Sequence, residues 1–171
     1  LLPFAGGRGI GLGHLRRCAA LAARLGIDQK GIRFVTVSLE AGAFLSDSGV
    51  PVVVSRPEEA LSGMISLLKE VPPPVVCVVD DPEFPSDSFR ALRRYAPVLC
   101  IDDTCERALP VDLVVNGSAG AEDLPCRGAT DTRYLLGPRY ILLRESFARE
   151  PKRPAEAGPV QRVLVLSGGG E

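Results

Sequence analysis

Apolar and polar positions follow two alternating patterns along the first 115 residues. Short apolar runs rich in β-branched residues supply the strand candidates, at residues 2–5, 32–38, 50–55, 75–80, 97–102 and 112–115. The runs are nearly continuous, which is typical of strands buried on both faces of a parallel sheet. Apolar positions at helical spacing supply the helix candidates between them, at residues 14–25, 40–48, 57–70 and 86–95. The pattern predicts an α/β fold with a Rossmann-like parallel sheet and helices on both faces.

The pattern changes after residue 115. Residues 116–127 are rich in Gly, Ser, Asp and Pro, which predicts a loop, and a short helix is expected at residues 139–149. Residues 150–160 are charged, contain proline and have no apolar period, as in an interdomain linker. A new strand and a glycine turn follow within residues 161–171. We therefore expect an N-terminal domain over residues 1–149, a linker, and the start of a truncated C-terminal nucleotide-binding domain.

Composition and charge narrow the class of protein. The chain has 171 residues, of which 46% are hydrophobic and 24% charged, enough to bury a core. Its net charge of −1 provides no basic field to attract nucleic acid. It has no apolar run of the roughly 20 residues that a membrane span needs, and its first residues lack the features of a signal peptide. We expect a cytoplasmic protein without nucleic-acid or membrane partners.

The five cysteines are expected to be buried and reduced. Their number is odd and no C-x-x-C pair occurs, which argues against a disulfide framework and against a zinc site. A cytoplasmic location favours the same state. The five are Cys18, Cys77, Cys100, Cys105 and Cys126.

A glycine-rich turn separates the first predicted strand from the first predicted helix. Glycine there permits positive φ and a close approach of a ligand to the backbone, next to the free amides of a helix N-terminus. The turn does not fit the dinucleotide fingerprint G-x-G-x-x-G, because His14 occupies the place of the third glycine. No G-K-[ST] follows, so the turn is not a P-loop either. Its glycines are Gly6, Gly7, Gly9, Gly11 and Gly13.

His14 is the only histidine of the chain. In the first turn of a helix it experiences the positive end of the macrodipole, which favours the neutral imidazole. A neutral imidazole can accept a proton, as a general base does. The alternative is a surface or capping histidine, and the sequence leaves both open.

Polar side chains follow three of the predicted strands, where a parallel sheet has its ligand crevice. Asp80 and Asp81 follow the fourth strand, Asp102 and Asp103 the fifth, and Asn116 the sixth. The carboxylates are candidates for orienting the imidazole or for binding sugar hydroxyls. Helix capping and turn formation are the alternatives. Capping is the better interpretation of Asp81, and Asn116 is an equal candidate for a turn role.

Five collinear blocks of the sequence resemble a known family. Residues 9–18 (GIGLGHLRRC) are similar to the G-x-G-H-x-x-R-C motif of the UDP-2,4-diacetamido-2,4,6-trideoxy-β-L-altropyranose hydrolases of pseudaminic acid biosynthesis. The spore-coat polysaccharide biosynthesis proteins share this motif. The other matching blocks are Val79-Asp80, residues 101–103, residues 112–116 and residues 135–144, and residues 163–169 look like the start of the family's C-terminal domain.

The resemblance implies a two-domain GT-B fold and a function. The implied reaction is hydrolysis of a UDP-linked amino sugar by water at the anomeric carbon, with C–O cleavage and inversion, and without a metal or another cofactor. It implies that His14 is the general base and that the diphosphate is bound near Gly168 and Gly169. It also implies that residues 1–171 alone are inactive, since the missing C-terminal domain binds the nucleotide. The expected substrate-binding residues are Gly11, Gly13, Arg17, Asp80, Asp103 and Asn116.

One position departs from the family. The hydrolases have a tyrosine in a D-x-Y arrangement after the fourth strand, whereas this chain has Asp80-Asp81-Pro82-Glu83-Phe84. The exact sugar therefore stays open. So do two other functions: a GT-B glycosyltransferase, in which His14 would activate an acceptor hydroxyl, and a non-catalytic module that binds a nucleotide sugar or a partner.

Overall fold

The computed structural model describes residues 2–4, 12–25, 31–46, 51–126 and 131–149, together with residues 159 and 163. The predicted linker and the start of a second domain lie outside these residues, apart from those last two positions. So do all glycines of the glycine-rich turn except Gly13. The predictions that fall there, including Gly11, Gly168 and Gly169, stay predictions.

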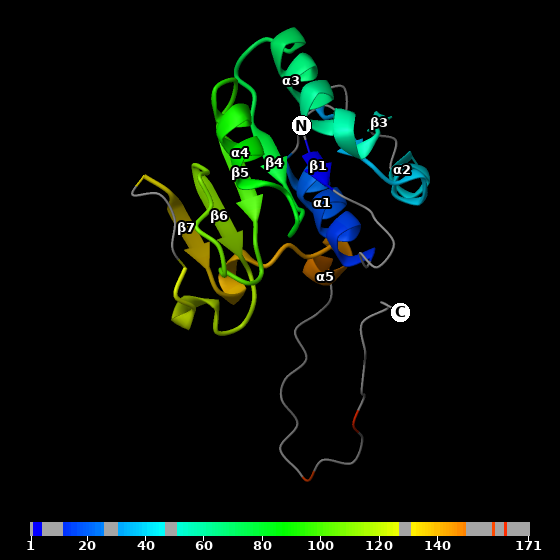
Figure 1. The fold of residues 1–171 in the computed structure, drawn as a ribbon. Coiled ribbons are helices and arrows are strands. Elements are labelled where there is room, and N and C mark those ends of the chain that lie inside the picture. The colour runs from blue at the N-terminus through cyan, green and yellow to red at the C-terminus, as the bar shows by residue number, and fades with distance from the viewer. Residues whose placement is uncertain are drawn as a thin grey trace.

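The described elements alternate between strand and helix up to β5, and β6 follows β5 without a helix between them, as the hydrophobic pattern predicted (Figure 1). The strands are short, and all but β7 lie within or next to the predicted runs. They are β1 (Leu2–Phe4), β2 (Phe34–Thr36), β3 (Val52–Val54), β4 (Cys77–Val79), β5 (Val98–Ile101), β6 (Leu113–Asn116) and β7 (Arg133–Leu136). The α-helices are α1 (Leu12–Arg24), α2 (Leu39–Ser46), α3 (Ala60–Glu70), α4 (Ser86–Arg93) and α5 (Glu145–Arg149).

All the strand pairs are parallel. One ladder has the order β1-β2-β3 and the other β4-β5-β6-β7. Strand β1 lies against β4, so the spatial order is β3-β2-β1-β4-β5-β6-β7. Successive strands are added outward from β1 in one direction and then from β4 in the other. This reversal creates a topological switch point between β1 and β4, where open α/β sheets bind their ligands.

Helices cover both faces of the sheet, which gives the predicted Rossmann-like α/β fold. On one face, α3 and α4 pack on buried residues of the central strands, among them Cys77 and Val79. On the other face, α1 and α2 pack on Phe34 and Val78. Neighbouring residues of one strand thus face opposite helical layers. This arrangement explains why the sequence shows continuous apolar runs, since both faces of each inner strand are buried.

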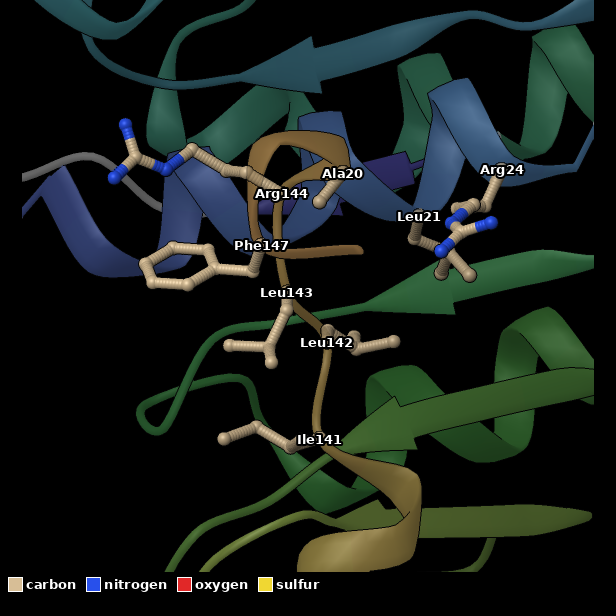
Figure 2. Close-up of a pocket in the computed structure, with 8 residues that line it drawn as sticks. All are labelled: Ala20, Leu21, Arg24, Ile141, Leu142, Leu143, Arg144 and Phe147. Carbon is tan, nitrogen blue, oxygen red and sulfur yellow. The ribbon is translucent and has the colours of Figure 1, made fainter. Parts of the chain in front are cut away.

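The stretch after β6 differs from the prediction. Strand β7 was not expected, and the predicted helix over residues 139–149 is wrong as one element. A 3₁₀ turn occupies Pro138–Tyr140, and only Glu145–Arg149 is α-helical. Between them, residues 141–144, here called the crossing segment, carry exposed Ile141 and Leu143 on either side of Leu142, which is partly buried and packs against the core (Figure 2). This alternation has the period of an extended chain and is incompatible with a helix.

Gly117 allows the crossing segment to pass close to the end of β6. A Cβ atom at this position would lie 2.5 Å from the Cα of Ile141 and 2.8 Å from its backbone nitrogen. Any other residue would press its Cβ atom against the backbone of Ile141, because a Cβ atom does not come this close to a non-bonded atom.

Within the described residues, no helix is both long enough and apolar enough to cross a membrane.

The cysteine prediction is right for three positions and wrong for two. Cys18, Cys77 and Cys100 are free and buried. Cys105 and Cys126 form a disulfide, with their Cα atoms 4.7 Å apart. Cys105 lies in the loop after β5 and Cys126 in the segment after β6. Because these strands are neighbours, the segments that follow them meet at one edge of the sheet, which a count of cysteines does not reveal.

We expect Cys126→Ser to lower the free energy of unfolding by about 3 kcal/mol. The bond joins positions 21 residues apart. A crosslink of that span lowers the conformational entropy of the unfolded chain, which stabilises the folded protein by about 3 kcal/mol. Urea unfolding without reductant measures the difference in the free energy of unfolding. A reductant should lower the stability of the wild type to that of the variant. Equal stability of the variant and the oxidised wild type would contradict the assignment.

Candidate functional site

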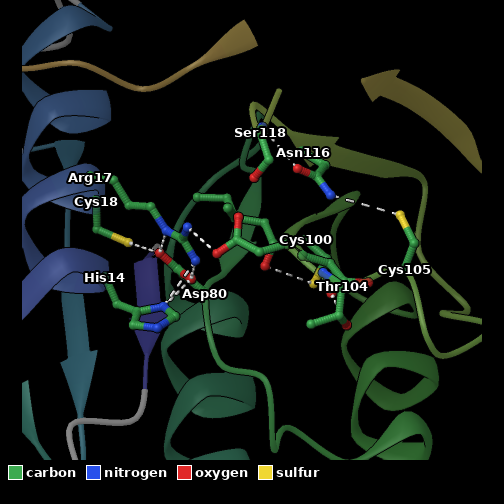
Figure 3. A network of polar contacts seen from close by, with 12 residues as sticks. His14, Arg17, Cys18, Asp80, Cys100, Thr104, Cys105, Asn116 and Ser118 are labelled. Carbon is green, nitrogen blue, oxygen red and sulfur yellow. Dashed lines mark hydrogen bonds and ion pairs between the residues drawn. The ribbon is translucent and has the colours of Figure 1, made fainter. Parts of the chain in front are cut away.

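A cluster of charged side chains lies at the switch point, beyond the carboxyl ends of β4 and β5 (Figure 3). His14 and Arg17 come from the first turns of α1, which begins at Leu12. Asp80 directly follows β4, and Asp103 lies two residues beyond β5. The topology thus brings together four of the residues that the sequence had singled out.

Asp80 is the centre of the cluster and is fully buried. Its Oδ1 accepts hydrogen bonds from Nδ1 of His14 at 2.7 Å and from Nη2 of Arg17 at 2.5 Å. Its Oδ2 accepts one from Nε of Arg17 at 2.5 Å and one from the thiol of Cys18 at 3.5 Å. A carboxylate has about four lone-pair positions. All four are used, so the group is held in one orientation.

The charges of the cluster compensate its burial. Burial alone raises the pKa of Asp80, but the hydrogen bonds and positive charge of Arg17, together with His14, outweigh it and lower the pKa below the usual range. Burial alone lowers the pKa of Arg17, but its bonds to Asp80 and Asp103 outweigh that and raise it. Both groups are therefore charged at neutral pH, and Arg17 is a fixed bidentate partner of the buried carboxylate.

The contacts of His14 define its tautomer. Nδ1 lies 2.9 Å from Nη2 of Arg17 as well as 2.7 Å from Asp80. An arginine N–H can only donate, and this one lies closer to Oδ1 of Asp80. We therefore place the proton of the neutral ring on Nδ1, donated to Asp80, which leaves a lone pair on Nε2. Among the described residues, none makes a hydrogen bond to Nε2. The side chain is 23% exposed.

Arg17 spans the site from Asp80 to Asp103. Its Nη1 donates to Oδ2 of Asp103 at 2.5 Å, while Nε and Nη2 hold Asp80. The sequence predicted a substrate-binding role for Arg17 and Asp103. In this arrangement the guanidinium is committed to two carboxylates. Asp103 is 44% exposed and lines the pocket beside His14.

The remaining predicted residues have other surroundings. Asp81 accepts the backbone N–H of Glu83, which is a turn role and not the helix capping that its sequence context favoured. Asn116 is fully buried: its Oδ1 accepts the N–H of Ser118 and its amide faces the sulfur of Cys105. This geometry favours the turn alternative for Asn116. Gly13 is exposed at the start of α1 with open space around it.

Sequence reasoning missed the role of Cys18. It had been assigned only to the core, although its thiol also donates to the buried carboxylate. Burial, and then the charge of Asp80, raise its pKa well above the usual range, so the sulfur keeps its proton. The signal was present in the spacing: His14, Arg17 and Cys18 stand at i, i+3 and i+4, which is one face of a helix.

Two pockets adjoin the cluster. One, of about 210 Å³, is lined by His14 and by the strand-end residues Asp81, Asp102 and Thr104. The other, of about 440 Å³, lies toward the crossing segment. Arg17 and Asp103 line both, so their ion pair is the shared wall. Within the part of the chain that the structure describes, no group of three or more His, Cys, Asp or Glu side chains is arranged to hold a metal ion.

Comparisons with known proteins add no family to this geometry. No protein-family model matches the chain, and no curated protein matches it significantly.

Proposed function

We propose that this chain supplies the general base for hydrolysis of a nucleotide-linked sugar at its anomeric carbon. The substrate class is a UDP-linked amino sugar, as the sequence motifs imply, in nonulosonate or surface-polysaccharide biosynthesis. The observation that carries the proposal is the pairing of His14 with Asp80 at the switch point of the sheet. A histidine whose Nδ1–H is held by a buried carboxylate presents Nε2 as a base of fixed direction.

The step uses the free nitrogen of His14. Nε2 takes a proton from a water molecule while the water oxygen bonds to the anomeric carbon. The bond from that carbon to the phosphate oxygen breaks, its electron pair leaves with UDP, and the anomeric configuration inverts. The imidazolium that forms is stabilised by Asp80, and it returns its proton to solvent. UDP is a good leaving group, so no separate general acid is required.

The surroundings of the base support this assignment. The pocket of about 210 Å³ beside His14 is lined by Asp81, Asp102 and Asp103, whose carboxylates accept hydrogen bonds from hydroxyl groups. Arg107 lines the same pocket and adds a donor. Polar groups converging on a concave space at strand ends are typical of ligand sites in open α/β sheets.

The test is UDP release by the full-length protein in ¹⁸O-labelled water without any acceptor. We expect UDP to be released, the label to appear on C1 of the free sugar, and early NMR spectra to show the inverted anomer. Label in UDP would mean P–O cleavage and would refute the proposed attack. UDP release only after an acceptor alcohol is added would identify a glycosyltransferase, and binding without release would identify a binding module.

A further inference from the structure

The pocket of about 440 Å³ has a lining that the proposed hydrolysis does not use. Its floor is apolar, formed by Ile101 and Val115, which are register partners at the ends of β5 and β6. Its side is formed by the crossing segment, in which Ile141 is 50% and Leu143 is 44% exposed. Exposed aliphatic side chains beside a buried aliphatic floor lose contact with water when a ligand covers them, which favours an apolar ligand group.

The same pocket has polar groups suited to an amide. Ser118 and Tyr140 line it and carry hydroxyls that both donate and accept hydrogen bonds. Ser118 is exposed, and the Oδ1 atom of Asn116 accepts its backbone N–H, so the residue is held at the end of β6. A hydrogen-bonding rim beside an aliphatic floor matches an acyl chain attached through an amide.

The position of the pocket connects it to the sugar. Arg17 and Asp103 line both this pocket and the pocket that holds His14. A ring placed at His14 therefore lies across the Arg17–Asp103 pair from this pocket, and Ile101 of the apolar floor lines both pockets. A substituent on that ring can reach across the pair while the anomeric carbon stays at the base.

We infer that this second pocket binds the acyl chain of an N-acylated sugar and prefers chains longer than acetyl. The inference rests on the proposed function for the position of the sugar ring. The second pocket has a volume of about 440 Å³, twice that of the pocket at His14. An acetyl group alone would leave most of the second pocket empty. Each further methylene that is buried strengthens binding about fourfold.

Binding of UDP-N-acetylglucosamine and UDP-N-butanoylglucosamine to the full-length protein tests this by calorimetry. We expect the butanoyl compound to bind about fifteenfold more tightly, since it buries two more methylenes. In the double variant Ile141→Ser, Leu143→Ser the preference should fall toward onefold. Both positions are exposed, so the fold should be retained, and the far-UV circular dichroism spectrum checks this. Leu39→Ser, at a residue of α2 that is 77% exposed, is the matched control and should keep the preference.

The outcomes separate this inference from the proposed function. Equal affinity for the two compounds, no binding of either, or a preference that survives in the double variant would overturn the acyl pocket. UDP release is measured in parallel samples. A chain-length preference that depends on residues 141 and 143, without UDP release, would reject the hydrolysis and retain the acyl pocket.

Discussion

His14→Ala is expected to slow UDP release by a factor of about 10²–10⁴, which is what a positioned general base contributes. Substrate binding should change little, because the imidazole presents only Nε2 to the crevice. Steady-state kinetics measures kcat, and calorimetry with a UDP-sugar measures the dissociation constant. Arg16→Ala is the matched control, since Arg16 is an exposed neighbour on the same helix. An unchanged kcat in His14→Ala would remove the histidine from the mechanism.

The companion variant Asp80→Asn examines how the base is held. The structure has the carboxylate accepting the Nδ1–H of His14. An amide NH₂ in its place donates to Nδ1 and moves the ring proton to Nε2, where it blocks proton abstraction. We expect most of the loss that His14→Ala shows. A kcat near the wild-type value would mean that Asp80 only stabilises the fold.

Arg17→Met is expected to lower the free energy of unfolding by about 3–5 kcal/mol at neutral pH. The substitution removes the bidentate partner of Asp80 and leaves a fully buried carboxylate short of its compensating charge, a loss that costs about this much. Urea unfolding measures it. Asp103→Asn is the control, because it removes only the ion pair between Arg17 and Asp103, which is exposed on the Asp103 side. Exposed ion pairs contribute about 1 kcal/mol or less to stability.

The pH dependence of the stability of Arg17→Met follows from the direction in which the pKa of Asp80 is shifted. In the wild type the pKa of Asp80 is lowered by Arg17 and His14, so this contribution to stability is present above the unfolded pKa of about 3.9 and is lost as pH falls through the folded value. Without Arg17, burial dominates and raises the folded pKa. The deficit of Arg17→Met should therefore shrink as pH is lowered from 7 toward 4. A deficit that stays constant over this range would mean that Asp80 is not its source.

Much of the site was predictable because it depends on topology. A histidine after the first strand and an aspartate after the fourth lie at neighbouring strand ends once the sheet has its usual order. The bonding of Arg17 was less accessible. An arginine at position 17 suits either a substrate contact or a bond to Asp80. Only the folded structure shows that its guanidinium already donates to Asp80 and Asp103.

The errors have a common physical origin in tertiary contacts. Strand β7 was missed because its residues are only partly buried at the edge of the sheet and have a weak apolar signal. The prediction of a helix over residues 139–149 was wrong because Leu142 packs against the core, and this tertiary contact is not encoded in the local sequence. The disulfide joins two segments that are distant in sequence and meet only after β5 and β6 have paired.

The crossing segment also connects the second pocket to a glycine at the end of β6. It follows the 3₁₀ turn after β7 and leads into α5, lies against Gly117 at Ile141, and lines one side of the second pocket. Because Ile141 both touches Gly117 and lines the second pocket, the shape of that pocket depends on the absence of a side chain at position 117.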